Sequence, residues 1–287
     1  MLVNFELNAL TSKQLTDDAK EKYDEDEEKM KADVEAIKTW ISKSPHLESI
    51  RQDEIFLRYF LRGCGHSLET TKKRLDMFFT VKSNLPAWFS GWDLQLKPLQ
   101  EILNAGIFLP LPGFDKKGRA VFLIRFGAIK PGSMKVDDIY KVSIMLLELA
   151  LEGNTQAGVK GLAIINDIEG VGPTQVAMMT PATMKKHIVV FQEAYPMENQ
   201  KLIDSSVMHF LNMPKIVETV FNLFLSQTKE IFKNMNMIHP KGDTSKLVEN
   251  VGREILPKDY GGENITVKVI RKKISKRRAF KNSLCRS

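Results

Sequence analysis

Cysteine is scarce in this 287-residue chain, which contains only Cys64 and Cys285. Two thiols can build neither a disulfide framework nor a cysteine-based zinc site. Long apolar runs are missing too, because the best one, residues 142–151, is interrupted by Glu148 and is too short to cross a bilayer. The N-terminus lacks the basic and apolar regions of a secretory signal. We therefore expect a cytoplasmic protein in a reducing compartment.

Motifs for catalysis are also lacking. The sequence has no G-x-S-x-G elbow, no Walker loop, no H-E-x-x-H pair and no G-x-G-x-x-G after a strand. The five histidines are scattered, and His187 and His209 stand in apolar segments, as structural histidines do. Asp167 and Glu169 end a predicted strand and fit either an acid/base pair or a capped strand end. We expect no enzymatic activity, no cofactor and no metal site.

Acidic residues are absent from the C-terminal stretch. Residues 268–287 contain nine basic residues, so the net charge of +7 becomes −2 for residues 1–267. The basic balance therefore belongs to a tail and indicates an anionic partner for that tail. Nucleic acid is the weaker candidate, because Phe280 is the only aromatic residue in this stretch.

Hydrophobic periodicity predicts a helical N-terminal region. Residues 16–30 are dominated by charge and are typical of a solvated helix, and residues 34–41 continue with apolar residues at helical spacing. Two further helices are predicted at residues 52–62 and 67–85. Together these segments predict a small helical bundle that ends near Trp92.

The pattern changes to alternating strands and helices after Leu99. Residues 106–111 and 119–126 predict two strands joined by a glycine-containing hairpin. The other predicted elements are helices at residues 139–152, 181–191, 214–232 and 247–251, strands at 161–166 and 205–211, and a weak edge strand at 265–270. The predicted fold class is α/β, with the N-terminal helical bundle followed by a mixed β-sheet and its helices.

Five short motifs occur in a fixed order between residues 50 and 262. They are Phe56–Arg62, Asp115–Val121, Gly161–Gly170, Tyr195–Pro196 with His209–Pro214, and Leu256–Gly262. In this order they resemble the motifs of the CRAL-TRIO lipid-binding family. The resemblance implies an N-terminal helical domain over residues 1–95, a CRAL-TRIO-type lipid-binding domain with a gated apolar cavity over 96–262, and a basic tail over 263–287.

The resemblance also implies a mobile gate helix over residues 212–228 that closes the cavity. Its apolar residues could seal a pocket and, with the helix swung out, lie on a membrane. Burying about 400 Å² of apolar ligand surface at about 25 cal/mol per Å² offers about 10 kcal/mol before ordering costs. That is enough to hold a lipid without a covalent step.

Ligand-binding residues follow from the same resemblance. They are Tyr140, Ser143, Leu147, Ile164, Ile165, Val171, Met179, His187, Phe191, Val207, His209, Leu211, Ile216, Val220, Phe221 and Phe224. Tocopherol-binding members present two serines on the helix that carries Ser143, whereas this chain has Leu147 at the second position. Val171 stands where they have an aromatic residue. We expect a tocopherol-, retinoid- or isoprenoid-like lipid.

A phosphoinositide-binding groove of the family is matched in part. Lys73 keeps a basic residue, and Lys229 and Lys233 lie next to the expected basic positions at the end of the gate, whereas Cys64 replaces an arginine. Lys272 and Lys273 of the tail could add to an anionic-membrane contact.

Two functions remain open at this stage. One is a carrier that transfers or presents a hydrophobic lipid, and the other is a phosphoinositide-sensing membrane-trafficking adaptor. In both, the expected partners are a hydrophobic lipid ligand and an anionic membrane surface. We expect a monomer that associates peripherally with membranes and does not bind nucleic acid.

Overall fold

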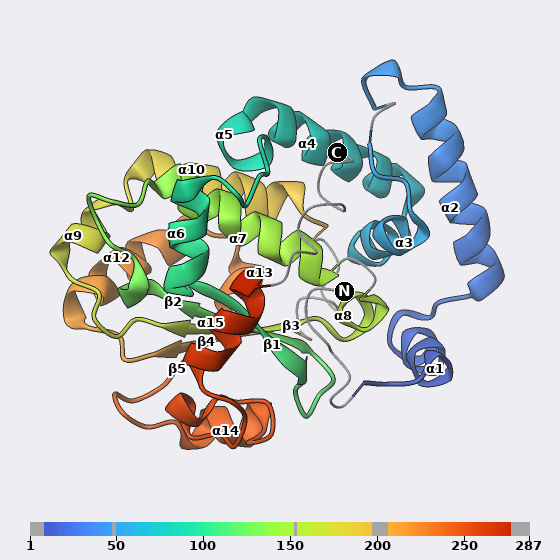
Figure 1. The fold of residues 1–287 in the computed structure, drawn as a ribbon. Coiled ribbons are helices and arrows are strands. Elements are labelled where there is room, and N and C mark those ends of the chain that lie inside the picture. Colours follow the sequence, from blue (N-terminus) through green and yellow to red (C-terminus); the bar gives the residue numbers. More distant parts are fainter. Residues whose placement is uncertain (1–8, 48–49, 152–153, 197–205, 277–287) are drawn as a thin grey trace.

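The computed structural model describes residues 9–47, 50–151, 154–196 and 206–276 (Figure 1). It confirms the predicted α/β fold, in which N-terminal helices pack beside a mixed sheet that has helices on both faces. The N-terminal helices are α1 (Ser12–Tyr23), α2 (Glu27–Ser42), η1 (Pro45–Leu47), α3 (Glu54–Gly63), α4 (Leu68–Asn84) and α5 (Pro86–Phe89).

Capping side chains fix where these helices begin. Thr11, Asp26, Asp53 and Ser67 each accept a hydrogen bond from the backbone amide three residues further on, which satisfies an otherwise unpaired donor at the helix N-terminus. The chain leaves α1 at Asp24, whose φ of 56° is left-handed and ends the helix. The single helix predicted over residues 16–30 is therefore two helices.

Helix α1 is also less solvated than its charge suggested. Ala19 and Tyr23 are buried, and the Tyr23 hydroxyl donates to the carbonyl oxygen of Val159 over 2.7 Å. Val159 belongs to α8 (Thr155–Lys160), so the first helix of the chain is attached to the region that carries the sheet.

The sheet has five strands among the described residues, in the order β1-β2-β3-β4-β5. Its strands are β1 (Phe108–Phe114), β2 (Ala120–Arg125), β3 (Leu162–Asp167), β4 (Val207–Leu211) and β5 (Asn236–Ile238). Strand β1 pairs antiparallel with β2, and the other pairs are parallel. The predicted hairpin is present, and Asp115 stabilises it: its carboxylate accepts from the Arg119 amide over 2.9 Å and from the Arg119 Nε over 2.6 Å.

The remaining helices cover the two faces of this sheet. They are α6 (Lys97–Ala105), η2 (Phe126–Ala128), α7 (Val136–Leu151), α9 (Pro173–Ala177), α10 (Pro181–Ile188), η3 (Val189–Ala194), α12 (Lys215–Ser226), α13 (Glu230–Lys233), α14 (Ser245–Val251), η4 (Lys258–Tyr260) and α15 (Val267–Lys276). Segment η3 is a π-helix that continues α10. The predicted helix at 181–191 thus changes its winding after Ile188.

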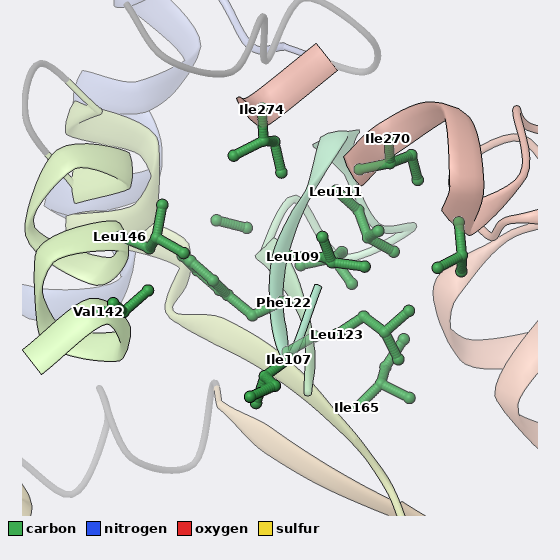
Figure 2. Close-up of a cluster of buried hydrophobic side chains, with 14 of the residues drawn as sticks. Ile107, Leu109, Leu111, Phe122, Leu123, Val142, Leu146, Ile165, Ile270 and Ile274 are labelled. Atoms are coloured by element: carbon green, nitrogen blue, oxygen red, sulfur yellow. The ribbon is translucent and has the colours of Figure 1, made fainter. Parts of the chain in front are cut away.

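Strand alternation separates two sets of core side chains. Figure 2 shows Phe122 directed toward Val142 and Leu146 of α7, whereas the next residue, Leu123, lies with Ile165 on the side of α15. Successive side chains point to opposite faces of a strand. Within one strand, the parity of the residue number, odd or even, therefore decides which helices the side chain meets.

The predicted edge strand at residues 265–270 is wrong. Residues 267–276 form the helix α15, in which Val267, Ile270 and Ile274 are buried against the sheet. Their spacing of three and four residues places them on one helix face. The edge opposite β1 is instead β5, whose three residues carry too little pattern to be recognised.

Candidate functional site

Helix α12 lies on one face of the sheet through its aromatic residues. The ring of Phe221 lies 4.6 Å from that of Phe210 on β4, and the ring of Phe224 lies 5.3 Å from that of His187 on α10. These two contacts, three residues apart on one helix face, define the inner side of α12. The structure thus brings Phe224 close to His187 and places Phe221 on the same side of α12, and all three are among the predicted ligand residues.

The rest of α12 is unusually open for so apolar a helix. None of its residues is buried, and Ile216 and Leu223 are 44% and 53% exposed. Ile216, which was expected to contact ligand, therefore points to the outside. The predicted gate over residues 212–228 corresponds to α12 followed by Gln227 and the buried Thr228, and the predicted long helix 214–232 is interrupted between α12 and α13.

The position of Phe210 identifies which strand residues share a face with α12. Met208 has the same parity as Phe210, and it pairs in register with Ile164 of β3. We call this side of the sheet the α12 face. Ile164, a predicted ligand residue, lies on it, and so do Met208 and Phe210, which the sequence interpretation did not include.

Four predicted ligand residues have the opposite parity. They are Ile165, Val207, His209 and Leu211, which lie on the side of the sheet covered by α14 and α15, here called the α15 face. There His209 contacts the Nε2 atom of His239 through its Nδ1 atom over 2.9 Å, and both side chains are buried. The sheet separates these residues from α12, so we no longer include them in the candidate site.

A polar-aromatic cluster continues the candidate site from α10 to α7. The Tyr140 hydroxyl lies 3.2 Å from Nδ1 of His187 and 3.9 Å from the sulfur of Met179. Phe191 is 4.7 Å from the His187 ring. On its other side, Tyr140 stacks on Trp88 with a centroid separation of 4.0 Å. Four of the predicted ligand residues thus lie together: Tyr140, Met179, His187 and Phe191.

Burial keeps this cluster uncharged. It lowers the pKa of His187 to about 4 and raises the pKa of the Tyr140 hydroxyl. Near neutral pH both groups are therefore neutral, and they can exchange hydrogen bonds without presenting a charge to an apolar molecule. The arrangement suits a ligand with a small polar end.

Ser143 and Leu147 lie on α7 within the packed interior. The Ser143 hydroxyl donates to the carbonyl oxygen of Ile139 over 2.5 Å, so its proton is used within the helix. Only its oxygen lone pairs remain for another partner. Leu147 is half-buried and packs against two hydrophobic clusters, one around the sheet and one among the N-terminal helices. Val171, in the turn after β3, and Val220 of α12 are likewise half-buried.

The carboxylate at the end of β3 has a structural role. Asp167 accepts hydrogen bonds from the Tyr260 hydroxyl over 2.6 Å and from the Asn212 side-chain amide over 3.0 Å. Its Oδ1 atom also accepts from the amide of Glu169 over 3.1 Å. Asp167 therefore links the Leu256–Gly262 motif, through Tyr260, and the segment before α12, through Asn212, to the end of β3. This agrees with a capped strand end.

Comparison with known proteins identifies the family. Residues 104–262, more than half of the chain, match the family model described as CRAL/TRIO domain. The chain belongs to the CRAL/TRIO family. Members of this family bind and transfer lipids. Residues 26–99 match a second model, described as Pinta-like, UBA domain.

Individual relatives agree with this assignment. The mouse protein named alpha-tocopherol transfer protein-like is 28% identical over 244 residues, which cover 85% of this chain and 68% of the relative. Rat clavesin-2 is 21% identical over 267 residues, covering 89% and 76%. The crystal structure of Sfh5 superposes with a TM-score of 0.56 at 19% identity, covering 88% and 90%, and supports the fold.

The CRAL/TRIO chain joins its N-terminal helices to the end of α12 through η3. Gln192 is buried in this π-helical segment, and its side-chain oxygen accepts from the Lys229 amide over 3.4 Å. Arg74 of α4 donates to the carbonyl oxygens of Gln192 and Glu193. No motif indicated Gln192, because its role depends on the wide turn that presents both its backbone and its side chain.

The basic residues predicted to meet phosphoinositides lie at two places. Lys73 on α4 precedes Arg74, which donates to η3, and the Lys229 amide donates to the Gln192 side chain of the same segment. Lys73 is paired with Glu69 over 2.6 Å, and Lys233 is paired with Glu230 over 2.5 Å, both at exposed positions. Lys272 and Lys273 are exposed on α15.

A cleft of about 490 Å³ lies elsewhere, between the N-terminal helices and the ends of α7 and α8. Arg51, Tyr59, Glu148 and Asn154 contribute to its lining, and none of the predicted ligand residues does. Its charged groups are engaged with each other, as in the contact of 3.8 Å between Arg51 and Glu148. This cleft is distinct from the α12 face.

The described residues contain neither a membrane-spanning helix nor a metal-binding cluster. Within the ranges described above, no helix is long and apolar enough to span a bilayer. The same part of the chain holds no cluster of three or more histidine, cysteine or acidic side chains that could bind a metal ion.

Proposed function

We propose that this CRAL/TRIO protein is an intracellular carrier of a small hydrophobic lipid of tocopherol, retinoid or isoprenoid type. The lipid would lie between the α12 face of the sheet and α12 itself, with the Tyr140 and His187 pair or the Ser143 oxygen near its polar end. The site requires no covalent chemistry, so we propose transfer or presentation of the lipid and no enzymatic turnover.

The observation that carries this proposal is the packing of α12. The helix contacts Phe210 of the sheet through Phe221 and His187 of α10 through Phe224, yet none of its residues is fully buried. We call the α12 face of the sheet together with α10 the wall. A helix held by so little buried surface can separate from the wall at a lower cost than a core helix. In this closed arrangement α12 covers the wall directly, so a ligand enters only when the helix moves outward.

The outer side of α12 supports a membrane-facing role for the open helix. Ile216 and Leu223 expose apolar surface in the closed arrangement. Apolar residues on a surface helix favour insertion at the boundary between lipid headgroups and acyl chains. We propose that α12 meets a membrane when it opens, and that the protein is otherwise a cytoplasmic monomer.

The first experiment is to identify the lipid that the protein carries. The full chain is purified from eukaryotic cells, and organic extracts are analysed by mass spectrometry. We expect one small apolar lipid at about one molecule per protein. Mixed phospholipids, or no lipid after gentle purification, would contradict the carrier function.

Two residues on α12 provide matched variants for this experiment. Phe224→Glu places a charge against the wall beside His187, so we expect lipid occupancy to fall at least tenfold. Asn222→Glu introduces the same charge at an exposed polar position of α12 and should leave occupancy unchanged. Equal occupancy in the two variants would show that the lipid does not lie under α12.

A phosphoinositide-sensing trafficking adaptor is the second candidate. It is favoured by one observation: Arg74, the neighbour of Lys73, and the Lys229 amide both donate hydrogen bonds to η3. An anionic headgroup beside η3 could pull on the end of α12. Phosphoinositide-dependent vesicle binding that is lost in Lys73→Gln/Lys229→Gln, without any apolar lipid in the purified protein, would favour the adaptor.

A further inference from the structure

Helix α15 presents a basic surface in a fixed direction. Val267, Ile270 and Ile274 face the sheet, and the opposite side exposes Lys268, Lys272 and Lys273. These three lysines occupy positions that share the outer face of an α-helix. We call them the α15 lysines. The sequence had suggested a basic tail, whereas the structure places these charges on a packed helix.

The helix is anchored at its start and along its inner side. The Val267 amide donates to the Asp259 carboxylate over 2.8 Å. The Arg271 side chain lies directly over Gly106 at the end of α6, where a side chain in place of the glycine hydrogen would overlap it. Because the helix is held at these points, the α15 lysines cannot turn toward the opposite side of the sheet.

That opposite side carries α12. Leu109, Leu123 and Ile165 are paired in register across β1, β2 and β3 and lie with α15 (Figure 2). Phe210, of the other parity, contacts Phe221 of α12. The apolar residues exposed on α12 and the α15 lysines therefore belong to opposite faces of one sheet.

The charge pattern identifies the partner of the α15 surface. Glu263 is the last acidic residue of the sequence, and nine basic residues follow it. Val269, 38% exposed, stands among the α15 lysines. A basic surface that includes an exposed aliphatic side chain and no aromatic one suits an anionic lipid bilayer, whereas stacking on nucleic acid bases requires aromatic groups.

We infer that α15 is a second membrane-binding surface, so that one molecule bridges two bilayers, one held by the α15 lysines and the other met by α12. A flat bilayer can contact only one face of the sheet at a time. The inference rests on the proposed function for its second contact, the opening of α12 at a membrane.

The test uses the full chain and vesicles of phosphatidylcholine containing 30% phosphatidylserine, with binding measured by sedimentation and bridging by light scattering. We expect the wild type to bind and to cluster the vesicles. Lys268→Gln/Lys272→Gln/Lys273→Gln should lower affinity by about a hundredfold, because each charge contributes about a fivefold factor at an anionic surface. It should also abolish clustering.

Two further variants separate the effect of the α15 lysines from that of general charge and from that of α12. Lys13→Gln/Lys20→Gln/Lys43→Gln removes the same charge from exposed N-terminal positions and should bind and cluster like the wild type. Ile216→Glu/Leu223→Glu alters only the outer side of α12 and should still bind through α15 but lose clustering. A fluorescent apolar lipid measures cavity occupancy in every variant.

The outcomes distinguish this inference from the proposed function. If the α15 variant binds and clusters vesicles as the wild type does, the α15 surface is refuted. If the wild type binds through the α15 lysines without clustering, α12 does not meet a membrane and bridging is refuted. Clustering by the wild type that survives in the α15 variant would reflect self-association of the protein and would also overturn the inference.

Discussion

Phe210 on β4 and Phe221 on α12 meet with their ring centroids 4.6 Å apart, and this contact joins the proposed gate to the wall that it covers. The residue before Phe210, His209, points away from α12 and toward His239 on the other side of the sheet. Adjacent residues of β4 thus face the proposed gate on one side of the sheet and the core on the other.

The aromatic contact should slow the release of bound lipid. Phe210→Leu and Phe221→Leu each remove one ring and should each raise the dissociation rate of a fluorescent lipid about three- to tenfold. A double-mutant cycle should give a coupling of about 0.5–1.5 kcal/mol, typical of an aromatic pair. Strictly additive effects would mean that the two rings do not act on each other during closure.

The buried His209 should make stability depend on pH. Burial, with His239 beside it, lowers the pKa of His209 to about 4, whereas an unfolded histidine titrates near 6.5. Between these values the unfolded state binds more protons than the folded state. Stability should therefore fall as the pH drops from about 6.5 to about 4, by about 2 kcal/mol at pH 5.

Urea unfolding at pH 7 and pH 5 measures this effect. His209→Gln should remove the corresponding part of the difference between the two pH values. Val251→Ala, a buried substitution without a titrating group, should lower stability equally at both values. A difference that persists unchanged in His209→Gln would assign the pH dependence to other groups.

Trp88 should be essential for the position of α7. Its ring is fully buried and stacked on Tyr140, and its Nε1 atom donates to Asp137 over 2.7 Å. Trp88→Ala should cost about 3–5 kcal/mol in thermal or urea unfolding, and Trp88→Phe less, because it keeps the stack. Asp137→Asn keeps an acceptor and should be nearly neutral. A small effect of Trp88→Ala would mean that the stack contributes little.

Gly63 should reverse the usual effect of a glycine-to-alanine substitution. Alanine in a helix normally gains about 1 kcal/mol over glycine. At Gly63, however, the added methyl group would overlap the carbonyl oxygen of Pro196, so we expect a loss of about 1–3 kcal/mol. Gly158→Ala in α8 is the control, since its methyl group would lie at an ordinary 3.6 Å from Tyr59. Equal urea midpoints for both variants would contradict the close approach.

The sequence was sufficient for the fold class, the hairpin and the central strands, because hydrophobic period and the order of the motifs are local properties. It was insufficient for residues 265–270, where Val267, Val269 and Ile270 fit both a strand and a helix. The packing of Ile274, four residues beyond Ile270, decides for the helix. Only tertiary structure shows that packing.

The candidate site could be predicted where helices supply it. Tyr140, His187, Phe221 and Phe224 converge because a helix concentrates its apolar residues on one side. Four of the five predicted strand residues lie on the face away from α12, since consecutive positions such as Ile164 and Ile165 cannot both face that helix. Register across β3 and β4 decides which of the two does, and a single sequence does not contain it.

The π-helical turn at Gln192 connects the two regions of the chain that match family models. Arg74 on α4 donates hydrogen bonds to the carbonyl groups of this turn, and the adjoining α10 and η3 carry His187 and Phe191 of the candidate site. The N-terminal helices therefore support α10 and η3, which form one side of the candidate site. A chimera that exchanged residues 26–99 for those of a relative would alter which lipid fits, although no exchanged side chain touched it.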